Sequence, residues 1–153
     1  MNRSEFHTGP VLARKENIEV IDCAGCGFAH IHPLPTPEVL QAFYEKEFYQ
    51  KDKPDYLNRD LEDLDWHRLN FERKRRLIAN ALGTETGRIC DVGSSHGFFL
   101  DYFKSKGWEV LGIEPSESAA EYSRREYSLD VVQGMLEDVS LDKLDPFDAV
   151  HLS

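Results

Sequence analysis

The chain has few cysteines, no long apolar run and no excess of positive charge. Three cysteines in 153 residues, an odd number, do not form a disulfide framework. No apolar run approaches the roughly 20 residues that a membrane-spanning helix needs, and the N-terminus lacks a secretory apolar region. A formal net charge of −10 argues against binding to nucleic acid or to anionic membranes. We therefore expect a cytoplasmic protein with no nucleic-acid or membrane partner.

The chain divides into three segments of different character. Residues 1–36 are β-like, with alternating strands expected over 18–22 and 28–32. Residues 37–83 are helical and form a linker or lid, and residues 84–153 alternate between strand and helix. This pattern predicts a small hairpin unit, a helical segment and an α/β domain.

Two helices are expected within the helical segment. Thr36 can cap the first, with Pro37 at its first position. The second is expected from about Arg59 to Leu82, and Gly83 is a natural stop. Its apolar stripe is Leu61, Leu64, Phe71, Ile78 and Leu82.

The stretch that follows the strand at 88–91 is the most informative in the chain. Small residues stand at the first, third and fifth positions of its turn, namely Gly93, Ser95 and Gly97. A dinucleotide-binding turn has its third small residue at the sixth position, where this chain has the bulky Phe98. Asp91 would repel a pyrophosphate, but it suits a cofactor that carries an ammonium group. The turn therefore favours a cationic nucleotide cofactor over NAD.

The sequence D-V-G-S-S-H-G from Asp91 to Gly97 resembles motif I of the class I S-adenosylmethionine-dependent methyltransferases, with Ser95 where a glycine usually stands. Glu114 then closes a second strand, where that family places an acid that accepts both ribose hydroxyls. The stretch 131–138 resembles the family's adenine-binding turn, and 147–153 resembles its fourth strand.

The adenine-binding turn departs from the family pattern at one position. The family often has an aspartate after the glycine of this turn, and this chain has Met135. We therefore expect Met135 to pack on the purine and Glu137 or the backbone to hold the adenine amino group. The resemblance implies a cofactor-binding set of Asp91, Gly93, Ser95, Gly97, Glu114, Pro115, Met135, Leu136 and Glu137.

The resemblance also implies a Rossmann-like, doubly wound α/β sheet of seven strands in the order 3-2-1-4-5-7-6. The pattern in this chain ends after the fourth strand, so 84–153 reads as the N-terminal half of the methyltransferase domain and the sequence as a partial one. The fourth strand, with an apolar edge, would then be open to self-association. Whether His151 on that strand points to the reaction side or into the core stays open.

A CxxCG sequence, Cys23 to Gly27, joins the two strands of the first segment. Two residues between cysteines let both thiolates reach one ion, but a tetrahedral zinc site needs two more ligands. The segment resembles the zinc-binding N-terminal extension of a subset of these methyltransferases, and we favour His7, Cys23, Cys26 and His30 as a structural zinc set in a zinc-ribbon-like hairpin. The alternative is a reduced cysteine pair in a tight turn with locally hydrogen-bonded histidines.

The function implied by the resemblance is methyl transfer from S-adenosylmethionine to a small-molecule acceptor. Two alternatives stay open. One is a non-catalytic zinc-binding interaction module on a degenerate nucleotide-binding fold, and the other is a fragment of a NAD-binding oxidoreductase. No catalytic residue and no general base can be named from the sequence.

Overall fold

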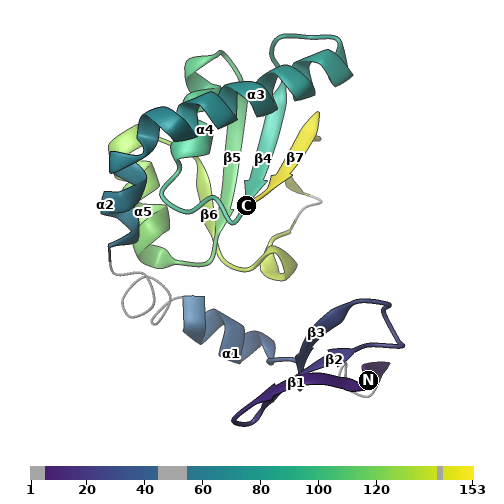
Figure 1. The fold of residues 1–153 in the computed structure, drawn as a ribbon. Helices are drawn as coiled ribbons and strands as arrows, with labels where there is room; N and C mark the ends of the chain where they lie inside the picture. Colours follow the sequence, from purple (N-terminus) through teal and green to yellow (C-terminus); the bar gives the residue numbers. More distant parts are fainter. Residues whose placement is uncertain (1–5, 45–54, 141–142) are drawn as a thin grey trace. The chain divides into compact units, whose positions relative to one another are not determined.

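The computed structural model describes residues 6–44, 55–140 and 143–153, which form two compact units, Met1–Leu40 and Gln41–Ser153 (Figure 1). None of the helices within the described ranges combines the length and the apolar character of a membrane span.

The first unit is built on a three-stranded antiparallel sheet in the order β1-β2-β3. Its strands are β1 (Val11–Lys15), β2 (Ile18–Asp22) and β3 (Ala29–His32). The predicted strands correspond to β2 and β3, whereas β1 was not predicted. All five residues of β1 are exposed, so its sequence has no buried face that could produce an alternating pattern.

The turns of this sheet follow from local chemistry. Two residues, Glu16 and Asn17, connect β1 to β2, and Glu16 has a positive φ of 53°. The loop between β2 and β3 carries the CxxCG sequence, with Cys23 buried beside Ile21. Helix α1 (Pro37–Ala42) begins at the predicted proline, and the amide of Val39 donates to the side chain of Thr36.

The second unit contains a four-stranded parallel sheet in the order β6-β5-β4-β7. The strands are β4 (Arg88–Val92), β5 (Glu109–Glu114), β6 (Val131–Gln133) and β7 (Ala149–Leu152). In chain order this arrangement is 3-2-1-4, as the predicted fold requires. Helix α4 (Phe98–Ser105) connects β4 to β5, and α5 (Glu117–Tyr127) connects β5 to β6. The side chain of Ser116 caps α5, accepting from the amide of Ala119.

The single helix expected over 59–82 is wrong, because the structure has two helices there. They are α2 (Tyr56–Glu62) and α3 (Leu64–Leu82), separated at Asp63. Asp63 has φ −93° and ψ 9°, outside the helical range, since aspartate competes poorly in helix interiors and favours helix ends. Two members of the predicted stripe, Leu61 and Leu82, are exposed. The predicted stop at Gly83 is confirmed by its left-handed φ of 71°.

The core of the second unit lies between the sheet and its helices. Its buried members are Ile89, Phe99, Leu100, Phe103, Trp108, Ala120, Leu129 and Val131. Phe71 and Ile78 from α3 pack against this core. Helix α3 therefore belongs with the sheet, and its inner face is placed beside the strand ends that carry the candidate site.

Candidate functional site

The turn after β4 has three residues in the left-handed region. Gly93, Ser95 and Gly97 have φ values of 80°, 50° and 83°. Glycine adopts this conformation without cost, which accounts for small residues at these spacings and for strain at Ser95. At Gly97 space is also lacking, because a Cβ would lie 2.6 Å from a methyl group of Leu129. The turn is thus a tight backbone path that leads directly into α4.

Asp91 lies at the base of this turn and is 1% exposed. Its Oδ1 lies 2.7 Å from Nδ1 of His151 and accepts from the hydroxyl of Ser153 at 3.0 Å. Its Oδ2 is buried and has no hydrogen-bond partner among the described residues. An unpartnered buried carboxylate oxygen is costly, so this atom is available to a cationic or hydrogen-bonding ligand.

Glu114 lies across the turn, at the end of β5. One carboxylate oxygen accepts from the amide of Ser95 at 2.7 Å and the other from the amide of Ser116 at 2.8 Å. Burial raises the pKa of Glu114, and the two amide hydrogen bonds oppose that shift. Each oxygen keeps acceptor capacity after one hydrogen bond, so the carboxylate can still receive a pair of ligand hydroxyls.

A pocket of about 490 Å³ opens at the carboxyl ends of β4 and β5. All the residues that the resemblance assigned to the cofactor line it: Asp91, Gly93, Ser95, Gly97, Glu114, Pro115, Met135, Leu136 and Glu137. The structure therefore brings together residues that follow three different strands in the sequence, and these residues surround one cavity.

Further residues line the same pocket without having been assigned to the cofactor. They are Tyr44, Asp60, His67, Phe71, Lys74, Val92, Ser94, His96, Phe98, Phe99, Ile113, Gly134, His151 and Ser153. Those from α2 and α3 had no sequence signal beyond helical spacing. The sequence also offers the aromatic residues of the helical segment as candidates for a substrate pocket, namely Tyr44, Phe48, Tyr49 and Trp66. Of these, Tyr44 lines the pocket, Trp66 is 64% exposed and does not, and Phe48 and Tyr49 lie outside the described residues.

Two histidines in the pocket differ in environment. His96, in the turn, is buried, and burial lowers its pKa to about 4. His151, on β7, is partly buried, with Nε2 2.7 Å from the ammonium nitrogen of Lys74 and its ring stacked on Phe99. The orientation that the sequence left open is therefore toward the pocket.

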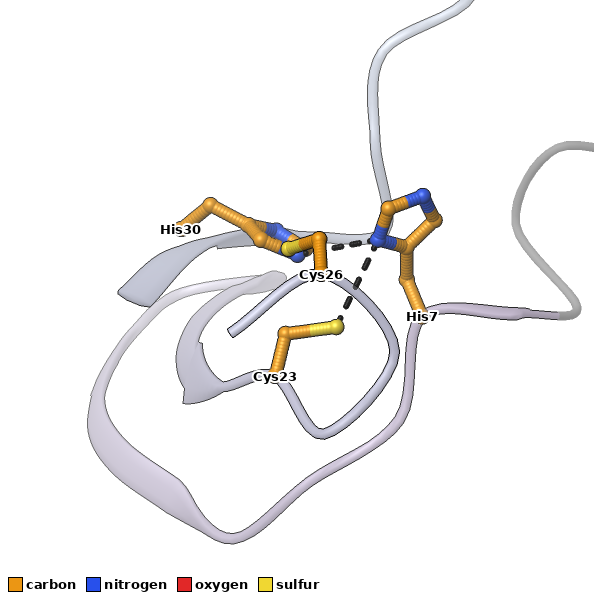
Figure 2. A group of neighbouring side chains, drawn as sticks. All are labelled: His7, Cys23, Cys26 and His30. Atoms are coloured by element: carbon orange, nitrogen blue, oxygen red, sulfur yellow. Dashed lines mark hydrogen bonds between the residues drawn. The ribbon is translucent and has the colours of Figure 1, made fainter. Parts of the chain in front are cut away.

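The first unit holds a second cluster of candidate ligands, shown in Figure 2. One potential ligand atom each from His7, Cys23, Cys26 and His30 lies within 4.8 Å of the others. Nδ1 of His7 is 3.1 Å from Nε2 of His30 and 3.4 Å from Sγ of Cys23. These are the four residues favoured from the sequence.

The thiol of Cys23 has an unusual environment within this cluster. Burial raises its pKa, but hydrogen bonds from the backbone of Cys26 and from the side chains of His30 and His7 outweigh that effect and bring the pKa to about 6. Nδ1 of His30 faces the backbone carbonyl of Ile31 at 2.8 Å, which leaves Nε2 directed at the cluster. A fixed histidine tautomer of this kind is common where the second nitrogen binds a metal.

Comparisons with known proteins agree with the geometry of the second unit. A family model described as a methyltransferase domain matches residues 90–153. An uncharacterized methyltransferase of Staphylococcus carnosus (strain TM300) is 28% identical over 110 residues, which are 70% of this chain and 51% of that protein.

Solved methyltransferase structures share the fold. The plantazolicin methyltransferase BpumL in complex with SAH matches with a TM-score of 0.59 and 20% identity, over 75% of this chain and 46% of that one. Streptomyces venezuelae DesVI matches with a TM-score of 0.53 and 23% identity, over 72% and 44%. The chain thus spans about half the length of the relatives it matches. Together the comparisons show that residues 90–153 are similar to part of a methyltransferase domain.

Proposed function

We propose that the protein is an S-adenosylmethionine-dependent methyltransferase that acts on a small-molecule acceptor. The observation that carries the proposal is the pocket itself, where the left-handed turn of 93–97 faces the carboxylates of Asp91 and Glu114. In open α/β sheets, ligands bind outside the carboxyl ends of the strands, which is where this pocket opens.

The residues present fit the cofactor in charge and hydrogen bonding. The unpartnered Oδ2 of Asp91 suits the ammonium group of the methionine moiety. Glu114 can accept the two ribose hydroxyls in the capacity left by its amide contacts. Met135 and Leu136 offer apolar surface to the adenine, and Glu137 an acceptor for its amino group. When bound, the cofactor would supply an activated methyl group.

Calorimetric titration of the protein with S-adenosylmethionine, S-adenosylhomocysteine and NAD tests this proposal. We expect both sulfur compounds to bind and NAD not to bind. Replacing Glu114 by Gln removes the charged ribose acceptor and should weaken binding about 10- to 100-fold, which corresponds to about 1.5–3 kcal/mol. The matched control is Glu117→Gln, an exposed position on the first turn of α5.

The titration also separates the two alternatives. Binding of NAD alone would support the oxidoreductase reading, because Glu114 could serve a ribose in either cofactor. Absence of binding by all three compounds would support the non-catalytic interaction module. Unchanged affinity of Glu114→Gln for S-adenosylhomocysteine would refute the role of Glu114 while leaving the cofactor in place.

We further propose that His7, Cys23, Cys26 and His30 hold a structural zinc ion. Zinc–nitrogen bonds of about 2.0–2.1 Å at the tetrahedral angle separate two nitrogens by about 3.3 Å, and a nitrogen from a sulfur by about 3.6 Å. The corresponding separations of 3.1 Å and 3.4 Å in the cluster are close to these values. Four protein ligands leave no position for water, which supports a structural role.

Elemental analysis of protein purified without a chelator tests the metal directly. We expect about one zinc per chain, reduced by Cys26→Ser and unchanged by His32→Gln, since His32 lies on β3 outside the cluster. Cobalt substitution should give the absorption of a tetrahedral site with sulfur and nitrogen ligands. A folded, metal-free first unit would support the alternative of a hydrogen-bonded cysteine–histidine cluster.

A further inference from the structure

His151 occupies the position where the pocket passes from the turn of 93–97 to helix α3. Its Nδ1 is 2.7 Å from Oδ1 of Asp91, and its Nε2 is 2.7 Å from Nζ of Lys74. The ring stacks on Phe99, with centroids 4.1 Å apart and planes inclined by 19°. The imidazole is therefore held in one orientation by contacts from β4, α3 and α4.

The two charged neighbours define the same protonation form of this ring. A carboxylate only accepts hydrogen bonds, so Asp91 requires the hydrogen to be on Nδ1. An ammonium group only donates, so Lys74 requires a free lone pair on Nε2. His151 is thus a neutral imidazole with its basic nitrogen directed at the pocket, which is the form a general base needs.

We infer that His151 is the general base of the reaction and that Asp91 orients it, an inference that rests on the proposed methyltransferase function. The ammonium group of Lys74 shows where a hydrogen-bond donor can reach Nε2. A methyl acceptor that carries an O–H or N–H group would displace the ammonium group and donate to Nε2 in its place. The methyl acceptor is therefore a nucleophile that loses a proton during the reaction. Among such nucleophiles, hydroxyl groups depend most on a base to remove that proton.

The proton and electron balance of the step is complete without a further reactant. The acceptor's lone pair forms a bond to the methyl carbon while the carbon–sulfur bond breaks and its electron pair stays on sulfur. The acceptor's proton passes to Nε2 of His151, and the resulting imidazolium is stabilised by the carboxylate of Asp91. Before an acceptor binds, the ammonium nitrogen of Lys74 lies 5.6 Å from the Phe99 ring centroid.

Asp91 connects this base to the cofactor site. Its Oδ1 contacts His151, and its buried Oδ2 has no partner among the described residues and is available to the proposed ammonium group. Among the described residues, the charged groups that contact His151 are Asp91 from β4 and Lys74 from α3. One carboxylate therefore aligns both reactants, which is the positioning that in-line methyl transfer requires.

Nitrogen-15 NMR of the labelled protein tests the protonation form. The imidazole signals of His151 are assigned by their loss in His151→Gln. At about pH 7.5 we expect a protonated Nδ1 and an unprotonated Nε2. A hydrogen on Nε2, or an imidazolium at this pH, would overturn the inference. This measurement needs no acceptor and no turnover.

Methyl transfer to phenol and to thiophenol tests the catalytic role. Thiophenol ionises without help near neutral pH, whereas phenol requires a base. His151→Gln should lower transfer to phenol by about 10²–10⁴-fold and transfer to thiophenol by much less. Affinity for S-adenosylhomocysteine should change less than about threefold, and His32→Gln, in the first unit, should match wild type in all three measurements.

The outcomes distinguish failure of the His151 inference from failure of the proposed function on which it rests. Failure of the wild-type protein to bind S-adenosylhomocysteine would refute the proposed function. Normal binding with equal losses for phenol and thiophenol, or with no loss, would refute the role of His151 alone. If the wild-type protein methylates neither phenol nor thiophenol, the inference is tested by the NMR measurement of the protonation form of His151.

Discussion

Substitution of Gly97 by Ala separates two reasons for a glycine in the turn. Gly97 has a φ of 83°, and an added Cβ would lie 2.6 Å from Cδ1 of Leu129 and 2.8 Å from Oγ of Ser123. Gly83, at the end of α3, has a similar φ of 71°, but no heavy atom lies within 4 Å of its Cβ position. Gly83→Ala is therefore a control that has the backbone cost without the steric one.

The two substitutions should differ in magnitude. A left-handed backbone costs a non-glycine residue about 1–2 kcal/mol, and this is the whole effect expected for Gly83→Ala. Overpacking adds about 1–3 kcal/mol at Gly97. Ser123 cannot give way easily, because it is fully buried and its hydroxyl contacts the carbonyl oxygens of Ser95 and Ala119 at 3.0 Å each. We expect Gly97→Ala to lower the free energy of unfolding by about 2–5 kcal/mol.

Urea unfolding followed by tryptophan fluorescence measures this difference. Trp66 and Trp108, the chain's 2 tryptophans, are both in the second unit, so the signal reports on that unit. Gly97→Ala should also weaken binding of S-adenosylhomocysteine at least tenfold, since relief of the clash displaces the turn. Equal shifts in the unfolding midpoint for the two variants would refute the steric argument.

Further predictions concern the turn, the proposed zinc site and the sheet edge. Ser95→Gly should stabilise the protein by up to about 1 kcal/mol in the same urea assay, because Ser95 has a φ of 50°. Burial lowers the pKa of His96 to about 4, so between about pH 6.5 and pH 4 the unfolded chain is protonated at this residue and the folded chain is not. The free energy of unfolding should therefore fall by roughly 3 kcal/mol over this range as the pH is lowered, and His96→Gln should remove this pH dependence. A chelator should lower the melting temperature of the first unit and leave cofactor affinity unchanged, as calorimetry would show. Val150 and Leu152, 62% and 72% exposed on β7, should support weak self-association in sedimentation, which Val150→Lys should reduce.

The features predicted best from the sequence are those set by local chemistry. The turn from Gly93 to Gly97 is recognisable because left-handed positions demand small residues at fixed spacing. Thr36 and Gly83 were identified as helix ends because caps depend on single residues. The cluster of His7, Cys23, Cys26 and His30 was identifiable because two of its members are three residues apart and a third lies on the adjoining strand.

The features that were missed depend on surroundings that lie far away in the chain. Helical periodicity continues across Asp63, so the break between α2 and α3 leaves no trace in the apolar pattern. Strand β1 has no buried face and therefore no alternation. The contact between Lys74 and His151 joins residues 77 positions apart, and only the packing of α3 on the sheet brings them together.

Asp91 shows most clearly what a motif can and cannot specify. The resemblance predicts an acidic residue at the end of the first strand of the domain and assigns it to the cofactor. It does not distinguish between the two oxygens of that carboxylate. In the fold the two oxygens of this carboxylate have different surroundings, because β7 pairs with β4 in a register that sets His151 beside Asp91. The oxygen facing β7 contacts an imidazole, and the other is buried without a partner among the described residues. The spacing of glycines contains no information on that register. A role for Asp91 in aligning a base therefore follows only from the pairing of strands 60 residues apart.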